Sequence, residues 1–269
     1  MSVNAELRAL AIDIPAQPEA LAKLSLLMAS DEVNVLALGR LVESDMALAA
    51  AVLRAVNSSL YGLEGRVQSV QQAITFLGLR EVAGITYELG LRAAFPPAAE
   101  LQPLWDRATR RALAMGRLAQ ALELDAWTAH SAGLFEECGK AVLFRHAKDH
   151  YRSMLRAACD DAALKEMERV GFGVSHDALG AALCETWGLS AAAVASVRHH
   201  VAVLAGGDLP QGADKQAACA LSLLANALLF ETEALDAAVT RVCQQTGWET
   251  SSCHQALQRV HEQLGAAPG

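Results

Sequence analysis

Apolar residues recur along this chain at the three- and four-residue spacing of one helix face, almost from end to end. Leu21, Leu24 and Leu27 share such a face, and Asp45 and Ser69 each stand directly before a later apolar run, where helix N-caps are expected. Roughly a fifth of the residues are alanine, the best helix former. The sequence therefore predicts an all-α fold of short helices.

Prolines interrupt this pattern near the middle of the chain. Pro96, Pro97 and Pro103 bracket a break, because proline cannot continue a helix interior and restricts the residue before it. We expect a helical N-terminal part, residues 1–97, packed on a second helical part, residues 98–269. The helices predicted in the second part cover residues 101–122, 127–138, 149–158, 162–169, 176–187, 191–200, 213–230, 235–245 and 251–264, with a buried stretch at 141–144.

Net charge, apolar runs and cysteine spacing exclude several kinds of partner, location and site for this chain. A net charge of −8, from 22 basic and 30 acidic residues, argues against a general nucleic-acid binder. No run of about 18 apolar residues predicts a membrane span, and the N-terminus lacks the pattern of a signal peptide. We therefore expect a cytoplasmic protein. Its cysteines contain no Cys-x-x-Cys pair and are predicted to be buried, reduced thiols: Cys138, Cys159, Cys184, Cys219, Cys243 and Cys253.

Four segments carry a more specific pattern. Asp45 to Ser58, followed by Tyr61-Gly62, combines a capped helix with an Asn-Ser end. Ser69 to Gly78 contains an Ala-Ile pair before Leu-Gly, and Gly133 to Lys140 reads Gly-Leu-Phe-Glu-Glu-Cys-Gly-Lys. Glu168 to His200 holds a glycine, a histidine, a Trp-Gly-Leu run and a final His-His pair.

In order and spacing, these segments resemble the HDOD family, a bacterial all-α regulatory module related to the metal-dependent HD phosphohydrolases. The resemblance covers about residues 14–200 and implies a degenerate HD-like second part. It also implies a role in signal transduction. Input would then arrive through a protein partner or a small ligand.

At the metal-binding positions of the catalytic relatives, this chain has different residues. The resemblance implies that a His on the first long helix, a His-Asp doublet and a later Asp would bind the metal that activates water. Here those positions hold Arg107, Glu136-Glu137 and Asn226. An arginine has no lone pair to give a metal, and asparagine offers only a neutral oxygen. We therefore predict no metal, no cofactor and no catalysis.

Arg107 suggests a replacement for the missing metal. We expect its guanidinium to pair with Glu136 or Glu137 and to neutralise the charge that a metal neutralises in active relatives. We expect this pair to be buried, so removing one partner would leave an unpaired charge at a cost of about 3–5 kcal/mol. Without the resemblance, Glu136-Glu137 would be interpreted as a solvated acidic pair.

The histidines allow two interpretations. His199 and His200 are adjacent and point about 100° apart on a helix, which favours two structural histidines over two ligands of one ion. His176 could face a ligand-binding cleft or simply begin a helix. By family analogy, a ligand-binding cleft between the two parts would be bounded by Arg107, Glu136, Glu137, His176, His199, His200 and Asn226.

The favoured function is a non-catalytic signalling module that binds a protein partner or a small ligand. The alternative is a divergent phosphohydrolase or phosphodiesterase whose metal site is rebuilt from Glu136, Glu137, His176 and His199. A third hypothesis is a scaffold that binds another protein through an exposed apolar surface.

Overall fold

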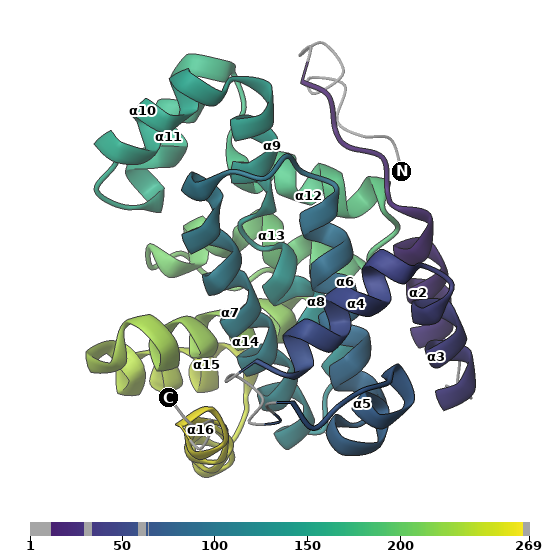
Figure 1. Ribbon diagram of the computed structural model, residues 1–269. Coiled ribbons are helices and arrows are strands. Elements are labelled where there is room, and N and C mark those ends of the chain that lie inside the picture. The colour runs from purple at the N-terminus through teal and green to yellow at the C-terminus, as the bar shows by residue number, and fades with distance from the viewer. Residues whose placement is uncertain (1–11, 30–33, 59–62, 64, 266–269) are drawn as a thin grey trace. The chain divides into compact units, whose positions relative to one another are not determined.

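The computed structural model describes residues 12–29, 34–58, 63 and 65–265, and every regular element in these residues is a helix (Figure 1). The predicted all-α fold is thus confirmed. Tyr61 and Gly62, which belong to the first family-like segment, lie outside the described residues. Among the helices of the described ranges, none is both long enough and apolar enough to cross a bilayer.

Contacts divide the chain into two compact units. The small unit comprises Ala16–Pro97 with Glu262–Gly269, and the large unit comprises Met1–Pro15 with Ala98–His261. The helices of the small unit are α2 (Glu19–Met28), α3 (Val35–Glu43), α4 (Met46–Val56), α5 (Val70–Leu77) and α6 (Leu79–Ala93).

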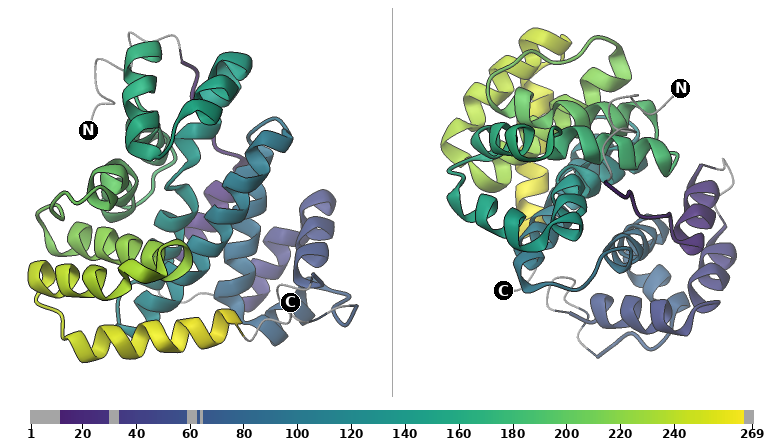
Figure 2. Two further views of the ribbon diagram at one scale, coloured as in Figure 1. Left: turned by 90° about the vertical axis from the view of Figure 1, so that its left-hand side faces the viewer. Right: turned by 90° about the horizontal axis from the view of Figure 1, so that it is seen from above.

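The large unit contains longer helices and two 3-10 turns. Its helices α7 and α8 pack on α13 and α14, α9 packs on α12, and α14 lies beside α15 (Figure 2). The elements are η2 (Ala99–Leu101), α7 (Gln102–Ala121), α8 (Ala126–Phe135), α9 (Cys138–His146), α10 (Lys148–Ala157), α11 (Asp161–Phe172), α12 (His176–Thr186), α13 (Ala191–Leu204), α14 (Ala213–Phe230), η3 (Thr232–Ala234), α15 (Leu235–Thr246) and α16 (Thr250–Gly265) up to His261.

Caps and one asparagine fix the small unit. The Asp45 carboxylate accepts the backbone N–H groups of the first turn of α4, and Ser69 caps α5 in the same way. At the end of α4 the Asn57 amide donates to Val67 O over 2.7 Å and accepts from Val67 N over 3.1 Å. The conspicuous Asn57 of the family-like segment therefore ties α4 to the chain that leads into α5.

Residues at the start of the described chain belong to the large unit. The indole N–H of Trp187 donates to the carbonyl oxygen of Pro15 over 2.9 Å, and Arg145 pairs with Asp13 over 2.9 Å. These contacts explain why residues up to Pro15 group with Ala98–His261, whereas the proline pattern alone assigned them to the N-terminal part.

One predicted helix is divided in the structure. The sequence predicted a helix over 127–138, but α8 ends at Phe135 and α9 begins at Cys138. Glu137, with φ −101° and ψ 6°, leaves helical geometry at this point. The break lets both Glu136 and Glu137 turn into the protein, where both are buried.

The expectation for the cysteines was partly wrong. None of the six, all of which lie in the described part of the chain, forms a disulfide. Cys159 is exposed and Cys243 is half-buried, because both lie near helix ends at the surface, while the other four are buried.

Candidate functional site

Five ionisable side chains meet at the turn between α8 and α9, and we call them the charge cluster: Arg107, Arg111, Glu136, Glu137 and Lys140. Glu137 is 2% exposed and accepts hydrogen bonds from three cations. Arg107 Nη2 lies 2.6 Å from its Oε2, Arg111 Nη2 2.7 Å from its Oε1, and Lys140 Nζ 3.3 Å from its Oε2. All its carboxylate oxygens are thus engaged by positive charge.

Helical spacing explains how these cations converge. Arg107 and Arg111 are four residues apart on α7 and therefore share one face. Lys140 lies one helical turn after Glu137, in the first turn of α9. The ion pair predicted for Arg107 is confirmed, with Glu137 as its partner. Sequence reasoning missed Arg111 and Lys140, although their spacing was a usable signal.

The pKa values of the two glutamates are shifted in opposite directions. Burial raises the pKa of Glu136 above its ordinary value, and its single paired cation, Arg111 with Nε 3.3 Å away, does not overcome this effect. Burial acts on Glu137 in the same direction, but Lys140, Arg111 and Arg107 outweigh it and hold the pKa of Glu137 well below the ordinary range. Glu137 is therefore the more acidic of the two carboxyl groups.

Arg107 is less buried than the sequence-based hypothesis required. Its side chain is 41% exposed, whereas that of Arg111 is 3% exposed. The deeply buried cations of the cluster are thus Arg111 and Lys140. We therefore expect removal of Arg107 to cost less than a fully buried pair would, because Glu137 keeps these two cations.

A cavity of 670 Å³ opens beside the charge cluster. Arg107, Glu137 and Asn226 line it, whereas Glu136, His176, His199 and His200 do not. All its lining residues lie between Glu100 and Glu231, within the large unit. The structure therefore places this cavity inside one unit, in contrast to the expected cleft between two parts.

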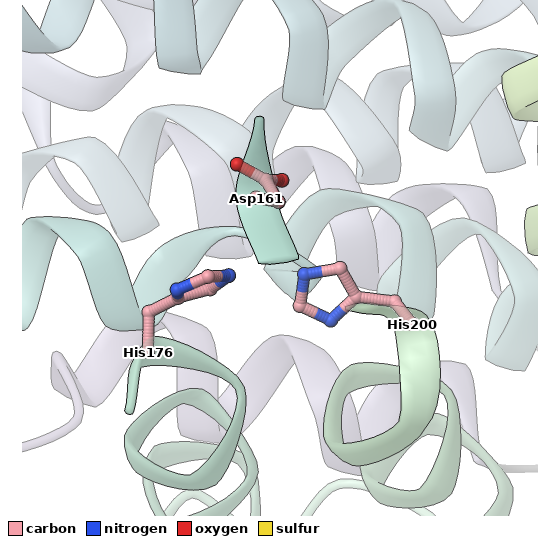
Figure 3. A group of neighbouring side chains, drawn as sticks. All are labelled: Asp161, His176 and His200. Carbon is pink, nitrogen blue, oxygen red and sulfur yellow. The ribbon is translucent and has the colours of Figure 1, made fainter. Parts of the chain in front are cut away.

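A second group, which we call the histidine cluster, consists of Asp161, His176 and His200. Figure 3 shows the two imidazoles pointing toward each other beside the Asp161 carboxylate. Their ring centroids are 5.3 Å apart, and one ligand-type atom from each of the three residues lies within 4.8 Å of the others. The side chains come from the first residues of α11 and α12 and from the middle of α13.

Both histidines are oriented by a hydrogen bond on the far side of the ring. His176 Nδ1 lies 2.7 Å from Oε2 of buried Glu168, which also accepts the His176 backbone N–H over 2.7 Å. His200 Nδ1 lies 2.7 Å from the carbonyl oxygen of Val197. Because a carbonyl only accepts, His200 Nδ1 carries the proton, and its Nε2 bears the lone pair.

A close helix crossing sets the position of His176. A Cβ atom added at Gly139 would lie 1.9 Å from the carbonyl oxygen of His176, so only glycine lets α9 approach α12 this closely. This contact joins the two clusters, because Gly139 follows Glu137 and precedes Lys140 on the same turn.

The predicted histidines separate in the structure. His200 is 2% exposed and faces His176, whereas His199 is half-buried. Among the described residues, no group at metal-binding distance joins His176 to His199 or to either glutamate. Sequence reasoning missed Asp161, because no local spacing links it to the histidines.

Comparisons with known proteins bear on the family and the fold of this chain. The profile of the HDOD domain matches residues 14–203. An uncharacterised protein of Treponema pallidum is 28% identical over 196 residues, which cover 70% of this chain but only 37% of that protein.

Three solved structures share the fold. A candidate signal transduction protein of Marinobacter aquaeolei is 22% identical with a TM-score of 0.75, covering 99% of this chain and 66% of its own. A candidate phosphohydrolase of Shewanella amazonensis is 18% identical with a TM-score of 0.71 and 98% of both chains covered. An HDOD domain protein of unknown function from Geobacter sulfurreducens is 16% identical with a TM-score of 0.66, covering 97% of this chain and 95% of its own.

These likenesses in structure concern the fold alone, and the chain spans about a third of the Treponema relative and just under two thirds of the Marinobacter structure. The family assignment follows from the profile, which covers more than half of the chain and includes all four family-like segments. It confirms the resemblance inferred from those segments: this chain belongs to the HDOD domain family.

Proposed function

We propose that the chain is a non-catalytic regulatory module of signal transduction, which acts by binding a protein partner or a small ligand. One observation carries this proposal: Glu137, at a position where HD phosphohydrolases are expected to hold their metal-binding doublet, accepts hydrogen bonds from Arg107, Arg111 and Lys140. A divalent ion there would have to displace these cations or lie among them.

The residues that stand at the metal-binding positions disfavour a catalytic metal for electrostatic reasons. Like charges repel strongly at a buried site, and a guanidinium cannot lose its proton to relieve the repulsion. Asn226, the remaining position of the set, lines the same cavity and offers only a neutral oxygen. The residues at these positions do not fit a divalent ion.

The cavity supports a binding role. Its volume of 670 Å³ is within the range of small-molecule sites, which is about 300–1,000 Å³. Arg107 lines it and is partly exposed, so its guanidinium is the cation that an entering anionic group would meet. The candidate signal transduction role of the Marinobacter structure agrees with such a module.

The small unit supports the protein-partner form of the proposal. Large apolar side chains are exposed on several of its helices, and a protein partner could cover them. These are Leu26 at 75%, Leu36 at 58%, Met46 at 88% and Phe76 at 59% exposed.

Hydrolysis of bis(p-nitrophenyl) phosphate tests the absence of catalysis. The wild-type chain and a Glu137→Ala variant would be compared with Mn²⁺, Fe²⁺ and Zn²⁺ added. We expect no metal-dependent turnover by either protein. Turnover by the wild type that disappears in Glu137→Ala would establish the alternative phosphohydrolase and end this proposal.

Thermal denaturation with inorganic pyrophosphate tests the small-ligand form. We expect pyrophosphate to raise the Tm of the wild type and to have a weaker effect on Arg107→Gln. Arg110→Gln is the matched control, because Arg110 is the exposed neighbouring arginine on α7 and does not line the cavity. An equal effect on all three proteins would mean that anions do not bind at Arg107.

A further inference from the structure

We propose that Asp161, His176 and His200 bind one divalent transition-metal ion, with Zn²⁺ as the best match, through the carboxylate and the Nε2 atoms of both imidazoles. This site differs from the expected one, which would use Arg107, Glu136-Glu137 and Asn226. The proposal goes beyond the regulatory role and does not depend on it.

Unpartnered nitrogen atoms point to a ligand. His176 is 0% exposed and His200 is 2% exposed, yet Nε2 of each ring is buried and has no hydrogen-bond partner in the described residues. Buried polar atoms are nearly always satisfied, and an unsatisfied one calls for an explanation such as an ion. Here two such atoms face one space beside a carboxylate (Figure 3).

The hydrogen bonds behind the rings select the required form of each histidine. Glu168 and the carbonyl of Val197 accept at Nδ1, which directs the lone pairs of Nε2 toward the cluster. Metal-binding histidines characteristically donate their other N–H to a carboxylate or a backbone carbonyl.

The three ligand atoms are close enough to form a zinc site after small side-chain movements. Ligand atoms of a tetrahedral zinc site lie about 3.3 Å apart, because zinc–nitrogen bonds measure about 2.0–2.1 Å. The three atoms here lie within 4.8 Å of one another, so small side-chain rotations are enough to reach that geometry. Two imidazoles and one carboxylate also form a recognised ligand set for zinc with an open position.

Lys140 sets a limit on the affinity. Its Nζ lies 2.7 Å from Asp161 Oδ1, so a bound ion would share this carboxylate with an ammonium group. We therefore expect binding weaker than that of a closed structural zinc site. Asp161 also lines the cavity, so an ion could reach the cluster from that side.

Isothermal titration of the full chain with ZnCl₂ is the first test, after treatment with a chelator and its removal. We expect one Zn²⁺ per chain and a loss of affinity of about 100-fold or more in His200→Gln. His199→Gln is the matched control and should bind zinc as the wild type does, because His199 lies outside the cluster. Loss of equal size in His199→Gln, or no saturable binding by the wild type, would overturn the proposal.

Histidine ¹⁵N NMR identifies the coordinating atoms without a buried substitution. Zn²⁺ should shift the Nε2 signals of His176 and His200 together and leave those of His199 unchanged. If His200→Gln fails to fold, Asp161→Asn provides the affinity test, since the Asp161 side chain is 37% exposed and its replacement is nearly isosteric. Unchanged Nε2 signals in the zinc-saturated wild type would disprove the site.

Discussion

Glu137 of the charge cluster and the two imidazoles of the histidine cluster are buried in the large unit, but their polar atoms are satisfied in opposite ways. Glu137 is held by three cations, whereas Nε2 of His176 and of His200 has no partner in the described residues. A buried carboxylate saturated by built-in cations destabilises the fold when a cation is removed, and it has little capacity left for an ion. Open lone pairs contribute nothing to stability until a ligand binds them.

Removal of Arg111 should have the largest effect on this comparison. Arg111→Met leaves Glu136 without its paired cation and Glu137 with only two, and we expect a loss of about 3–5 kcal/mol in the free energy of unfolding. Urea denaturation measures it. Arg110→Met, an exposed neighbour, should cost less than about 1 kcal/mol. Similar losses in both variants would show that the charge cluster does not stabilise the fold.

Gly139→Ala should disturb both clusters together. The new Cβ would meet the carbonyl oxygen of His176 at 1.9 Å, so α9 and α12 must separate, at an expected cost of about 3 kcal/mol. The control is Gly39→Ala in α3, where the nearest atom is 3.4 Å away and the stability should hold or rise slightly. Urea denaturation of both variants gives the comparison, and a stable Gly139→Ala would contradict the inferred close crossing.

Acid should act first on the histidine cluster. His200 takes up a proton near its ordinary pKa of 6.5 when unfolded but only near 3 when folded. Stability from this group is thus complete above pH 6.5 and decreases as the pH falls, by about 2 kcal/mol between pH 6.5 and 5. Urea denaturation with chelator present should show this slope, and His200→Gln should lack it.

The control for this pH dependence is His199→Gln. Burial and Arg198 lower the pKa of His199 as well, but the side chain is only partly buried, so its removal should take away a smaller part of the slope. Identical slopes in the wild type and His200→Gln would rule out a depressed pKa at His200.

Arg107→Met should have the smallest effect. We expect a loss of about 1 kcal/mol, because the side chain is 41% exposed and Glu137 keeps Arg111 and Lys140. Thermal denaturation distinguishes this value from the about 3–5 kcal/mol expected for a buried pair. An unchanged Tm would remove Arg107 from the charge cluster, and a loss as large as that of Arg111→Met would mean that the two arginines are equivalent.

Much of the fold could be predicted from local patterns. The helix predicted over 213–230 coincides with α14, and the caps at Asp45 and Ser69 are present as predicted. Such features depend on residues a few positions apart, whose spacing is visible in a sequence. The break at Glu136-Glu137 was missed, because apolar residues lie on both sides of it and the buried Arg111 of α7, which pairs with both glutamates, is distant in the sequence.

For the candidate sites, too, the sequence predicted only what local spacing determines. The sequence by itself determined the all-α class, the family and the pairing of Arg107 with one of two glutamates. Tertiary structure alone decided that Arg111 and Lys140 are the buried cations, that His200 and not His199 faces His176, and that Asp161 completes their cluster. The physical reason is that helical periodicity fixes which side chains share a face, whereas the packing of α11, α12 and α13 fixes which faces meet.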